Sequence, residues 1–422
     1  FIANRIGVFG MMAIMKIMEK LQLSIDEIDA LTGPLAGRPK SATFRTADVV
    51  GIDTLIKVAK GVYDNCPNDE AKDIFNIPAW LNKMVENNWL GDKTGQGFFK
   101  KVKTPEGKSD IQVLNLQTME YTARQKPKFA TLEAAKPIED LPARLKILIN
   151  GTDKAGEFYR QFHYSLFSYI SHRIPEISDE VYRLDDAMMA GFGWEIGAFE
   201  SWDASGLAKT TEAMKAAGFT VAKWVDDMLA AGHNTFYKVE NGKRLYYDIA
   251  GKTYKNLPGG DTFLVMKYFT NQTIWKNSSS RVYHLGDDVL GLEWNTKMNS
   301  IGGEVLESIQ KGISLAEEKY KGLVIANESA NFSAGANIGM IFMLAIEQDY
   351  DEIDMAIRMF QNTMMRVRYS SIPVVIAPHG LALGGGCEIC LHADKVIPAA
   401  ETYTGLVEVG IGVIPGGGGS KE

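Results

Sequence analysis

Three consecutive glycines, Gly384 to Gly386, restrict the fold of this chain more than any other feature of its sequence. They stand between a strand-like and a helix-like segment in GLALGGGCEICLHADKV, residues 380–396. Because glycine has no Cβ, it permits sharp turns and lets the main chain approach a ligand closely. The sequence therefore predicts a tight strand-to-helix turn whose backbone lies against a ligand.

Nucleotide-binding and metal-binding patterns do not account for these glycines. Neither Lys nor Ser/Thr follows them, as a Walker A loop requires, and the dinucleotide fingerprint GxGxxG is absent. Cys387 and Cys390 form a CxxC, but no second pair completes a zinc site and no thioredoxin-like context supports a redox pair. We interpret them as partly buried helix thiols. We expect neither a metal site nor a cofactor-binding site in these residues.

Once nucleotide and metal sites are excluded, the remaining interpretation of the glycines is a backbone site that stabilises a developing negative charge. Amides at the start of a helix point outward and favour negative charge, which suits an oxyanion hole. A second donor is available in the small-residue turn ANFSAGANIG, residues 330–339, which follows another strand-like segment. Each loop alone is also compatible with an ordinary tight turn, but the pair favours a catalytic interpretation.

Two carboxylates accompany the glycines. Glu388 falls in the first turn of the predicted helix, and Glu408 precedes another glycine-rich turn in YTGLVEVGIGVIPGGGG. A single Glu is usually a surface residue. Two carboxylates beside an oxyanion site would suit acid–base chemistry on a water molecule or a carbon acid.

The rest of the chain divides into blocks of different periodicity. Residues 1–102 and 141–240 carry helical patterns, and residues 103–140 predict a small hairpin followed by an exposed linker. RIGVFGMMAIMKIMEKL is apolar on all sides, which predicts a buried helix, and Ser24 with Glu27 forms a capping-box pattern. Beyond these blocks strand-like and helix-like segments alternate, which indicates an α/β layer.

The two helical blocks also resemble each other. In both blocks an acidic helix is followed along the chain by a glycine-rich turn, a Phe, an Asp and then a Gly with an aliphatic residue. In this alignment Asp48 corresponds to Asp203. Their ends agree as well, GFFKKV against TFYKVE. Two copies of one helical unit explain these parallels better than the general likeness of amphipathic helices does.

Charge and cysteine content exclude several classes of protein. A net charge of −7 without a sustained Lys/Arg block disfavours a nucleic-acid or anionic-membrane surface. No apolar run reaches the about 18 residues that a membrane span needs. The 3 cysteines indicate a reducing compartment, so we expect a cytoplasmic protein. Because both ends look cut, we interpret the chain as an internal fragment of a longer polypeptide.

These motifs resemble two known families. NFSAGANI, GLALGGGCEICLHADKV and VEVGIGVIPGGGG resemble those of the enoyl-CoA hydratase (crotonase) superfamily, and GRPKSATFRTADVVGIDT resembles the C-terminal helical domain of 3-hydroxyacyl-CoA dehydrogenase. Their order is similar to that of bacterial multifunctional fatty-acid oxidation proteins. The resemblance implies a multidomain fold, with two all-α dehydrogenase-type domains before a C-terminally incomplete α/β crotonase domain of the ββα-spiral type. The implied segments are residues 1–102, first helical domain; 103–140, hairpin and linker; 141–240, second helical domain; and 280–422, crotonase domain.

The resemblance also implies roles for particular residues. In crotonases two backbone amides polarise the thioester carbonyl, and Ala336 and Gly385 occupy the matching positions. Two glutamates around the attacking water match Glu388 and Glu408. Asn4 matches the Asn of the dehydrogenase NR motif, which hydrogen-bonds near the catalytic His and the substrate.

The implied reaction is hydration of trans-2-enoyl-CoA to 3-hydroxyacyl-CoA, with NAD-dependent oxidation to 3-ketoacyl-CoA in the intact protein. NAD would be bound by an upstream Rossmann domain that this fragment lacks. Implied partners are acyl-CoA thioesters and either a thiolase or further copies of the chain. The alternatives are an enoyl-CoA isomerase and a non-catalytic acyl-CoA-binding assembly subunit. The family often has Asp where Asn337 stands, but that position donates neither amide.

Overall fold

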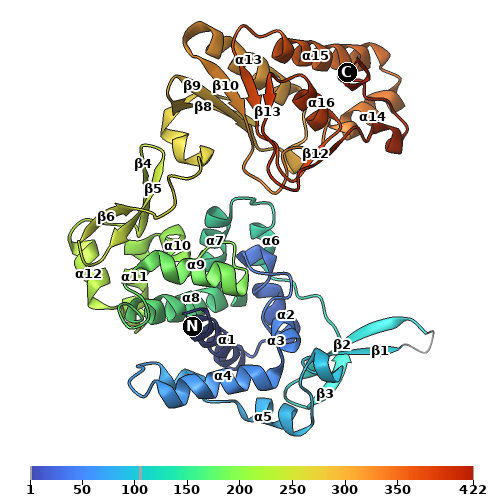
Figure 1. Cartoon of the computed structure of the whole chain (residues 1–422). Coiled ribbons are helices and arrows are strands. Elements are labelled where there is room, and N and C mark those ends of the chain that lie inside the picture. The colour runs from blue at the N-terminus through green and yellow to red at the C-terminus, as the bar shows by residue number, and fades with distance from the viewer. Residues whose placement is uncertain (1, 104–106, 422) are drawn as a thin grey trace. The chain divides into compact units, whose positions relative to one another are not determined.

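The chain folds into two compact units in a computed structural model that describes residues 2–103 and 107–421 (Figure 1). The first unit comprises Phe1–Lys238 and Leu245–Leu257, and the second comprises Val239–Arg244 and Pro258–Glu422. In the part of the chain that the structure describes, no helix has the length and apolar character needed to cross a membrane.

The first unit begins with a buried helix, α1 (Ile2–Leu21), as its apolar pattern predicts. The capping box at the start of the next helix is also confirmed, because Ser24 Oγ accepts from Glu27 N at 3.2 Å and Glu27 Oε2 accepts from Ser24 N at 2.7 Å. The remaining elements of this block are α2 (Ile25–Leu31), η1 (Pro34–Ala36), α3 (Phe44–Val50), α4 (Ile52–Asn65), η2 (Lys72–Phe75), α5 (Ala79–Glu86) and η3 (Asp92–Thr94).

A three-stranded antiparallel sheet follows, formed by β1 (Phe99–Lys103), β2 (Ser109–Asn115) and β3 (Glu120–Ala123). The predicted hairpin is thus confirmed, although its residues 104–106 lie outside the described residues. The prediction of an exposed linker was wrong in part, because α6 (Ala130–Ala135) buries one face. Its Thr131 donates to Asp153 from both its backbone N (3.0 Å) and its hydroxyl (2.6 Å).

The second helical block completes the first unit. Its elements are α7 (Leu141–Asn150), α8 (Lys154–His172), α9 (Val181–Phe192), α10 (Ala198–Ser205), α11 (Leu207–Ala216) and α12 (Lys223–Ala230). Three short strands, β4 (Tyr237–Glu240), β5 (Lys243–Asp248) and β6 (Thr253–Asn256), follow along the chain.

Aspartates hold equivalent turns in the two helical blocks. Each accepts hydrogen bonds from two successive backbone amides at 2.7 to 3.1 Å: Asp29 from Phe44 and Arg45, Asp185 from Phe199 and Glu200, Asp48 from Phe98 and Phe99, and Asp203 from Phe236 and Tyr237. The pairing of Asp48 with Asp203 is the one that the sequence predicts. Each carboxylate satisfies two amides that would otherwise lack a partner.

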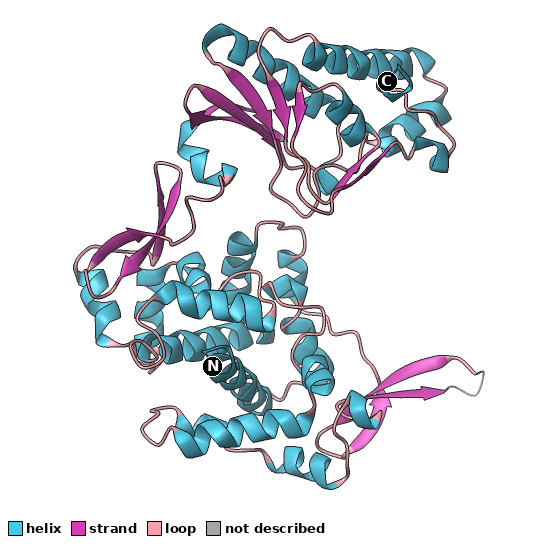
Figure 2. Ribbon diagram, in the orientation of Figure 1, coloured by secondary structure: helices cyan, strands magenta, loops and turns pink. Residues whose placement is uncertain are grey.

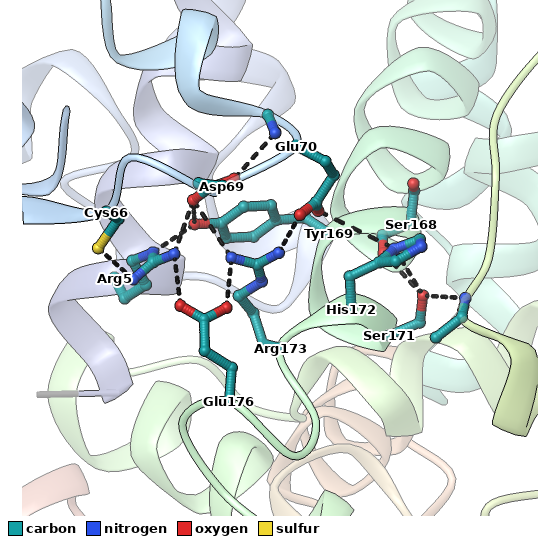
Figure 3. Close-up of polar contacts among 12 residues, drawn as sticks. Arg5, Cys66, Asp69, Glu70, Ser168, Tyr169, Ser171, His172, Arg173 and Glu176 are labelled. Carbon is teal, nitrogen blue, oxygen red and sulfur yellow. Dashed lines mark hydrogen bonds and ion pairs between the residues drawn. The ribbon is translucent and has the colours of Figure 1, made fainter.

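A buried ionic cluster ties α1 to α8 (Figure 3). Asp69 Oδ2 accepts from Arg5 Nη2 at 2.7 Å and from the Tyr169 hydroxyl at 2.9 Å, and it lies 3.2 Å from Arg173 Nη1. Glu176 bridges the same two arginines at 3.0 and 2.7 Å. Each arginine in this cluster therefore faces carboxylates, as expected of charges removed from water.

The second unit is an α/β layer, as the alternating pattern predicts. Its six-stranded sheet, magenta in Figure 2, has the order β13-β11-β10-β9-β8-β7. β9, β10, β11 and β13 run parallel, while β7 and β8 are antiparallel additions. The bounds are β7 (Thr273–Lys276), β8 (Ser280–Gly286), β9 (Val289–Trp294), β10 (Gly322–Ile325), β11 (Val374–Ile376) and β13 (Lys395–Val396).

Helices and a second, smaller sheet complete this unit. α13 (Gly303–Lys319) packs on β8, β9 and β10, and α15 (Tyr350–Arg368) packs on α13. The other elements are η4 (Met266–Gln272), η5 (Lys297–Asn299), α14 (Ile338–Glu347), β12 (Leu381–Leu383), α16 (Gly385–Leu391), β14 (Tyr403–Gly405), η6 (Glu408–Ile411) and η7 (Gly419–Lys421). The glycine run thus lies at a strand-to-helix turn, as predicted: Gly384 separates β12 from α16, and Gly385 and Gly386 begin the helix.

Replacing Asp48 by Asn should destabilise the first unit. The new side chain offers one oxygen and turns an NH₂ group towards the second backbone N–H, which then stays unsatisfied at a cost of about 1–3 kcal/mol. We expect the free energy of unfolding in urea at pH 8, followed by far-UV circular dichroism, to fall by that amount. Asp64→Asn, at an exposed position of α4, is the matched control. An equal loss in both variants would contradict the assigned role of Asp48.

Candidate functional site

Two backbone segments from distant parts of the sequence meet at the glycine run. β12 pairs in parallel with β14 on one side. On its other side it binds the 330–339 turn, since Ser333 N donates to Leu381 O at 2.9 Å and Leu383 N donates to Ser333 O at 3.0 Å. This pairing brings the two small-residue loops that the sequence singles out into contact.

The absence of side chains at the glycines allows this contact. Gly384 adopts a φ of +52°, which disfavours other residues. A Cβ at each of the three positions would crowd another group of the protein. On Gly384 it would lie 3.1 Å from Glu408 Oε1, and on Gly385 it would lie 2.7 Å from the Phe360 ring. On Gly386 it would lie 2.8 Å from Ser333 Cβ. The glycines thus permit a close approach of groups of the protein itself, and the approach of a ligand to this backbone stays a prediction.

Two backbone amides, those of Ala336 and Gly385, lie side by side at the point of contact. A Cβ on Gly385 would lie 3.2 Å from Ala336 N, and one on Gly335 would lie 3.2 Å from Gly385 N. Within residues 2–103 and 107–421, neither amide donates a backbone hydrogen bond. Both N–H groups therefore lack a backbone acceptor within the described residues.

Glu388 is buried next to these amides, with 3% of its surface exposed. Its Oε1 accepts from Gly419 N at 2.9 Å. Burial raises the pKa of Glu388, the Gly419 amide opposes that rise, and the negative charge of Glu408 adds to it. Glu388 thus holds its proton to a higher pH than an exposed Glu does.

Glu408 begins η6 and lies over Gly384. Its Oε2 is buried, and no hydrogen bond to it exists within the described part of the chain. A buried carboxylate oxygen without a donor is costly unless a ligand or a water molecule supplies one. Within the residues that the structure describes, the site therefore presents one acceptor and two backbone donors that have no partner.

The other residues singled out from the sequence lie elsewhere or have local partners. Asn4 is exposed on α1 of the first unit. Asn337 N donates to Ile301 O at 3.1 Å and precedes α14. Cys387 and Cys390 are free buried thiols in α16. The described residues include no group of His, Cys, Asp and Glu side chains that would hold a metal ion.

Phe360 and Gly419 are contacts of the site that the sequence did not reveal. Phe360 lies on α15, and its ring closes over Gly385. A Cβ on Gly417 would collide with Glu388 Oε2, so the glycines of VIPGGGG let the backbone pack on this carboxyl. That glycine run was the one available signal for the second contact.

Comparisons with known proteins match both end regions of the chain to family models and the whole chain to longer relatives. Family models described as "3-hydroxyacyl-CoA dehydrogenase, C-terminal domain" and "Enoyl-CoA hydratase/isomerase" match residues 1–101 and 289–422. A "Probable 3-hydroxyacyl-CoA dehydrogenase" of Bacillus subtilis is 45% identical over 100% of this chain and 53% of its own length. A "Putative fatty acid oxidation complex trifunctional enzyme" of Rickettsia felis is 26% identical over 100% of the chain and 54% of its own.

The chain therefore spans about half the length of the curated relatives that it matches. Among solved structures, an enoyl-CoA hydratase from Bacillus anthracis is 28% identical to this chain, with a TM-score of 0.32. The match covers 34% of this chain and 56% of the hydratase chain.

Replacing Glu408 by Gln should lower the pKa of Glu388, because the substitution removes the negative charge that raises it. Isotope-edited infrared titration of the Glu388 carboxyl would measure the change. Glu307→Gln, at an exposed position of α13, is the control and should leave that pKa unchanged. A Glu388 pKa that stays the same in Glu408→Gln would show that the two carboxylates are not coupled.

Proposed function

We propose that this chain, which joins a 3-hydroxyacyl-CoA dehydrogenase C-terminal domain to an enoyl-CoA hydratase/isomerase domain, hydrates trans-2-enoyl-CoA to 3-hydroxyacyl-CoA in fatty-acid β-oxidation. One observation carries the proposal. The free amides of Ala336 and Gly385 lie beside two carboxyl groups, one with a raised pKa and one with an unpartnered oxygen.

The two amides would bind the thioester carbonyl oxygen of the substrate. Hydration places negative charge on that oxygen, because the electrons of the carbon–carbon double bond move towards it when water attacks the β-carbon. Fixed N–H donors stabilise this charge without having to reorganise. The amides thus favour the enolate over the neutral thioester, which lowers the barrier.

The two glutamates would hold the attacking water and move its proton. Glu408 Oε2 has a free lone pair for one water O–H. Glu388, whose pKa is raised by burial, holds a proton more readily than an exposed Glu does. The water oxygen bonds to the β-carbon, its proton passes through the carboxyl pair, and the α-carbon gains a proton as the enolate collapses.

The first unit supports a second proposal, that the polypeptide also takes part in oxidation of 3-hydroxyacyl-CoA with NAD. Asn4 would hydrogen-bond near the substrate, as its match to the NR motif implies. The described residues do not themselves fit NAD, since Gly384–Gly386 pack against protein groups and no GxGxxG turn is present. Hydride transfer is therefore not assigned to them.

The two helical blocks are proposed to be copies of one unit. The paired aspartate contacts of Asp29 with Asp185 and of Asp48 with Asp203 support it, because each pair caps the same turn in its own block. The domain limits at residues 1–102, 103–140, 141–240 and 280–422 remain predictions.

Acyl-CoA thioesters are the proposed ligands, and a thiolase or further copies of the chain are the proposed partners. A cytoplasmic location is proposed on the ground that Cys66, Cys387 and Cys390 are all free thiols. The proposed protein partners and location do not bear on the residues that carry the hydration.

Glu388→Gln and Glu408→Gln should each slow hydration by about 10²–10⁴-fold, the usual contribution of a positioned acid or base. The assay uses the longest polypeptide that the gene encodes, with crotonyl-CoA and without NAD, and follows loss of the conjugated enoyl-thioester absorbance. Glu307→Gln should retain the parent rate.

The same assay separates the alternatives. An isomerase needs one base and no bound water. If the protein is an isomerase, the parent protein would not hydrate crotonyl-CoA, and Glu408→Gln would still isomerise a 3-enoyl-CoA. A folded parent protein that binds the thioester but catalyses neither reaction would be the non-catalytic subunit.

Gly385→Ala should reduce kcat/KM for crotonyl-CoA by about 10²–10³-fold, the usual effect of losing one oxyanion donor. The added methyl group would meet the Phe360 ring at 2.7 Å and crowd Ala336 N at 3.2 Å, so the two amides must move apart. Gly303→Ala, where a Cβ meets nothing within 4 Å, is the control. Full activity in Gly385→Ala would rule out this pair of amides.

A further inference from the structure

Arg38, in the GRPKS turn of the first unit, lies between two aromatic rings. Its Cζ is 4.5 Å from the ring centroid of Phe162 and 4.3 Å from that of Trp194. Cation–π contacts of this kind hold a guanidinium by its faces and leave the N–H groups on its edge available. None of the residues assigned to hydration lies in this unit.

No carboxylate balances the charge of Arg38. Among the residues that the structure describes, none forms an ion pair or a hydrogen bond with its guanidinium. By contrast, Arg5 and Arg173 share Asp69 and Glu176. Arg38 is only partly buried, so its guanidinium can still exchange a bound water molecule for a ligand. It differs from Arg5 and Arg173 because none of the described carboxylates pairs with it.

The neighbouring titratable groups do not supply the missing negative charge. Burial raises the pKa of Tyr159, which therefore stays neutral at pH 7. Burial and the charge of Arg38 together lower the pKa of His163 to about 4, so the imidazole is neutral as well. Burial lowers the pKa of Arg38 to about 10, which leaves it cationic at neutral pH.

A small cavity of about 40 Å³ adjoins Arg38. That volume holds about three water-sized groups, the size of a carboxylate head. Apolar side chains, among them Met11 and Ile14, form one part of its wall, and Thr43 and Thr46 form another.

The hydroxyl protons of the two threonines are already used. Thr43 Oγ1 donates to Thr32 Oγ1 at 2.8 Å, and Thr46 Oγ1 donates to Ala42 O at 2.6 Å. The guanidinium edge is therefore the principal donor available to a bound ligand, and it can pair with two oxygens at once.

We propose that this cavity binds the carboxylate of a short organic acid, with Arg38 pairing with both oxygens and the apolar wall contacting the carbon chain. A carboxylate suits the cavity better than phosphate, whose additional oxygens would face apolar side chains without a donor. The proposed site is independent of the hydration site and would survive its failure.

Calorimetric titration of the full chain with butyrate at low ionic strength tests the proposal. Butyrate should bind saturably, while butyramide, which has the same shape without the charge, and inorganic phosphate should bind at least tenfold more weakly. Arg38→Gln should weaken butyrate binding at least tenfold. Lys40→Gln, which removes an exposed positive charge two residues away, should leave it unchanged.

A second variant keeps the charge and tests the cavity itself. In Gly10→Ala the added Cβ would lie 3.8 Å from the Phe162 ring, an ordinary contact, so the protein should fold while the cavity narrows. We expect weaker butyrate binding at unchanged thermal stability.

Several results would overturn the proposal. If the parent protein does not bind butyrate saturably, or if Arg38→Gln binds it as well as the parent does, then Arg38 is only a clamp between two rings. Equal binding of butyramide or phosphate would reject a carboxylate site. Full affinity in Gly10→Ala would place the binding outside this cavity.

Discussion

The close approach of two backbone segments, residues 333–336 and 384–386, is the constraint on which the architecture of the second unit's site depends. It exists because no Cβ stands between them, and a single methyl group at Gly385 would meet Phe360 at 2.7 Å. The same approach aligns two free amides and brings Glu408 over Gly384. The proposed oxyanion donors and the carboxyl groups therefore share one geometric cause. We propose that the glycines serve a backbone site for a charged oxygen and not a phosphate loop.

The polar groups discussed above are of two kinds: matched groups, which have a hydrogen-bond or ion-pair partner in the protein, and unmatched groups, which lack one among the described residues. The cluster around Asp69 is matched, because arginines and carboxylates face each other in a buried place, and it fastens helices together. The paired aspartates of the helical blocks are matched as well, each to two backbone amides. Among the described residues, Glu408 Oε2 has no hydrogen-bond donor and Arg38 has no carboxylate partner. Natural sequences tend to break the rules of local satisfaction at functional sites, which is why these two positions carry the functional proposals.

Much of the fold followed from local patterns. The buried α1, the capping box at Ser24, the hairpin and the alternation of strands and helices in the second unit all rest on periodicity or on residues a few positions apart. The exposed linker was misjudged at α6, because the buried Thr131 is held by a hydrogen bond to Asp153, 22 residues further along. Phe360 and Gly419 were missed for the same reason. Their roles come from contacts with Gly385 and Glu388, which no short-range pattern encodes.

The sequence by itself determined which kinds of element form, where the backbone can turn without a side chain, and which carboxyl groups follow those turns. These properties depend on the conformational freedom of single residues and on short-range periodicity. Only the tertiary structure decided that the amides of Ala336 and Gly385 lie side by side, that Glu388 is buried with a raised pKa, and that one oxygen of Glu408 has no hydrogen-bond partner in the described part of the chain. Hydrogen bonding and desolvation act over a few ångströms between atoms from distant parts of the chain, so folding must first bring those atoms together.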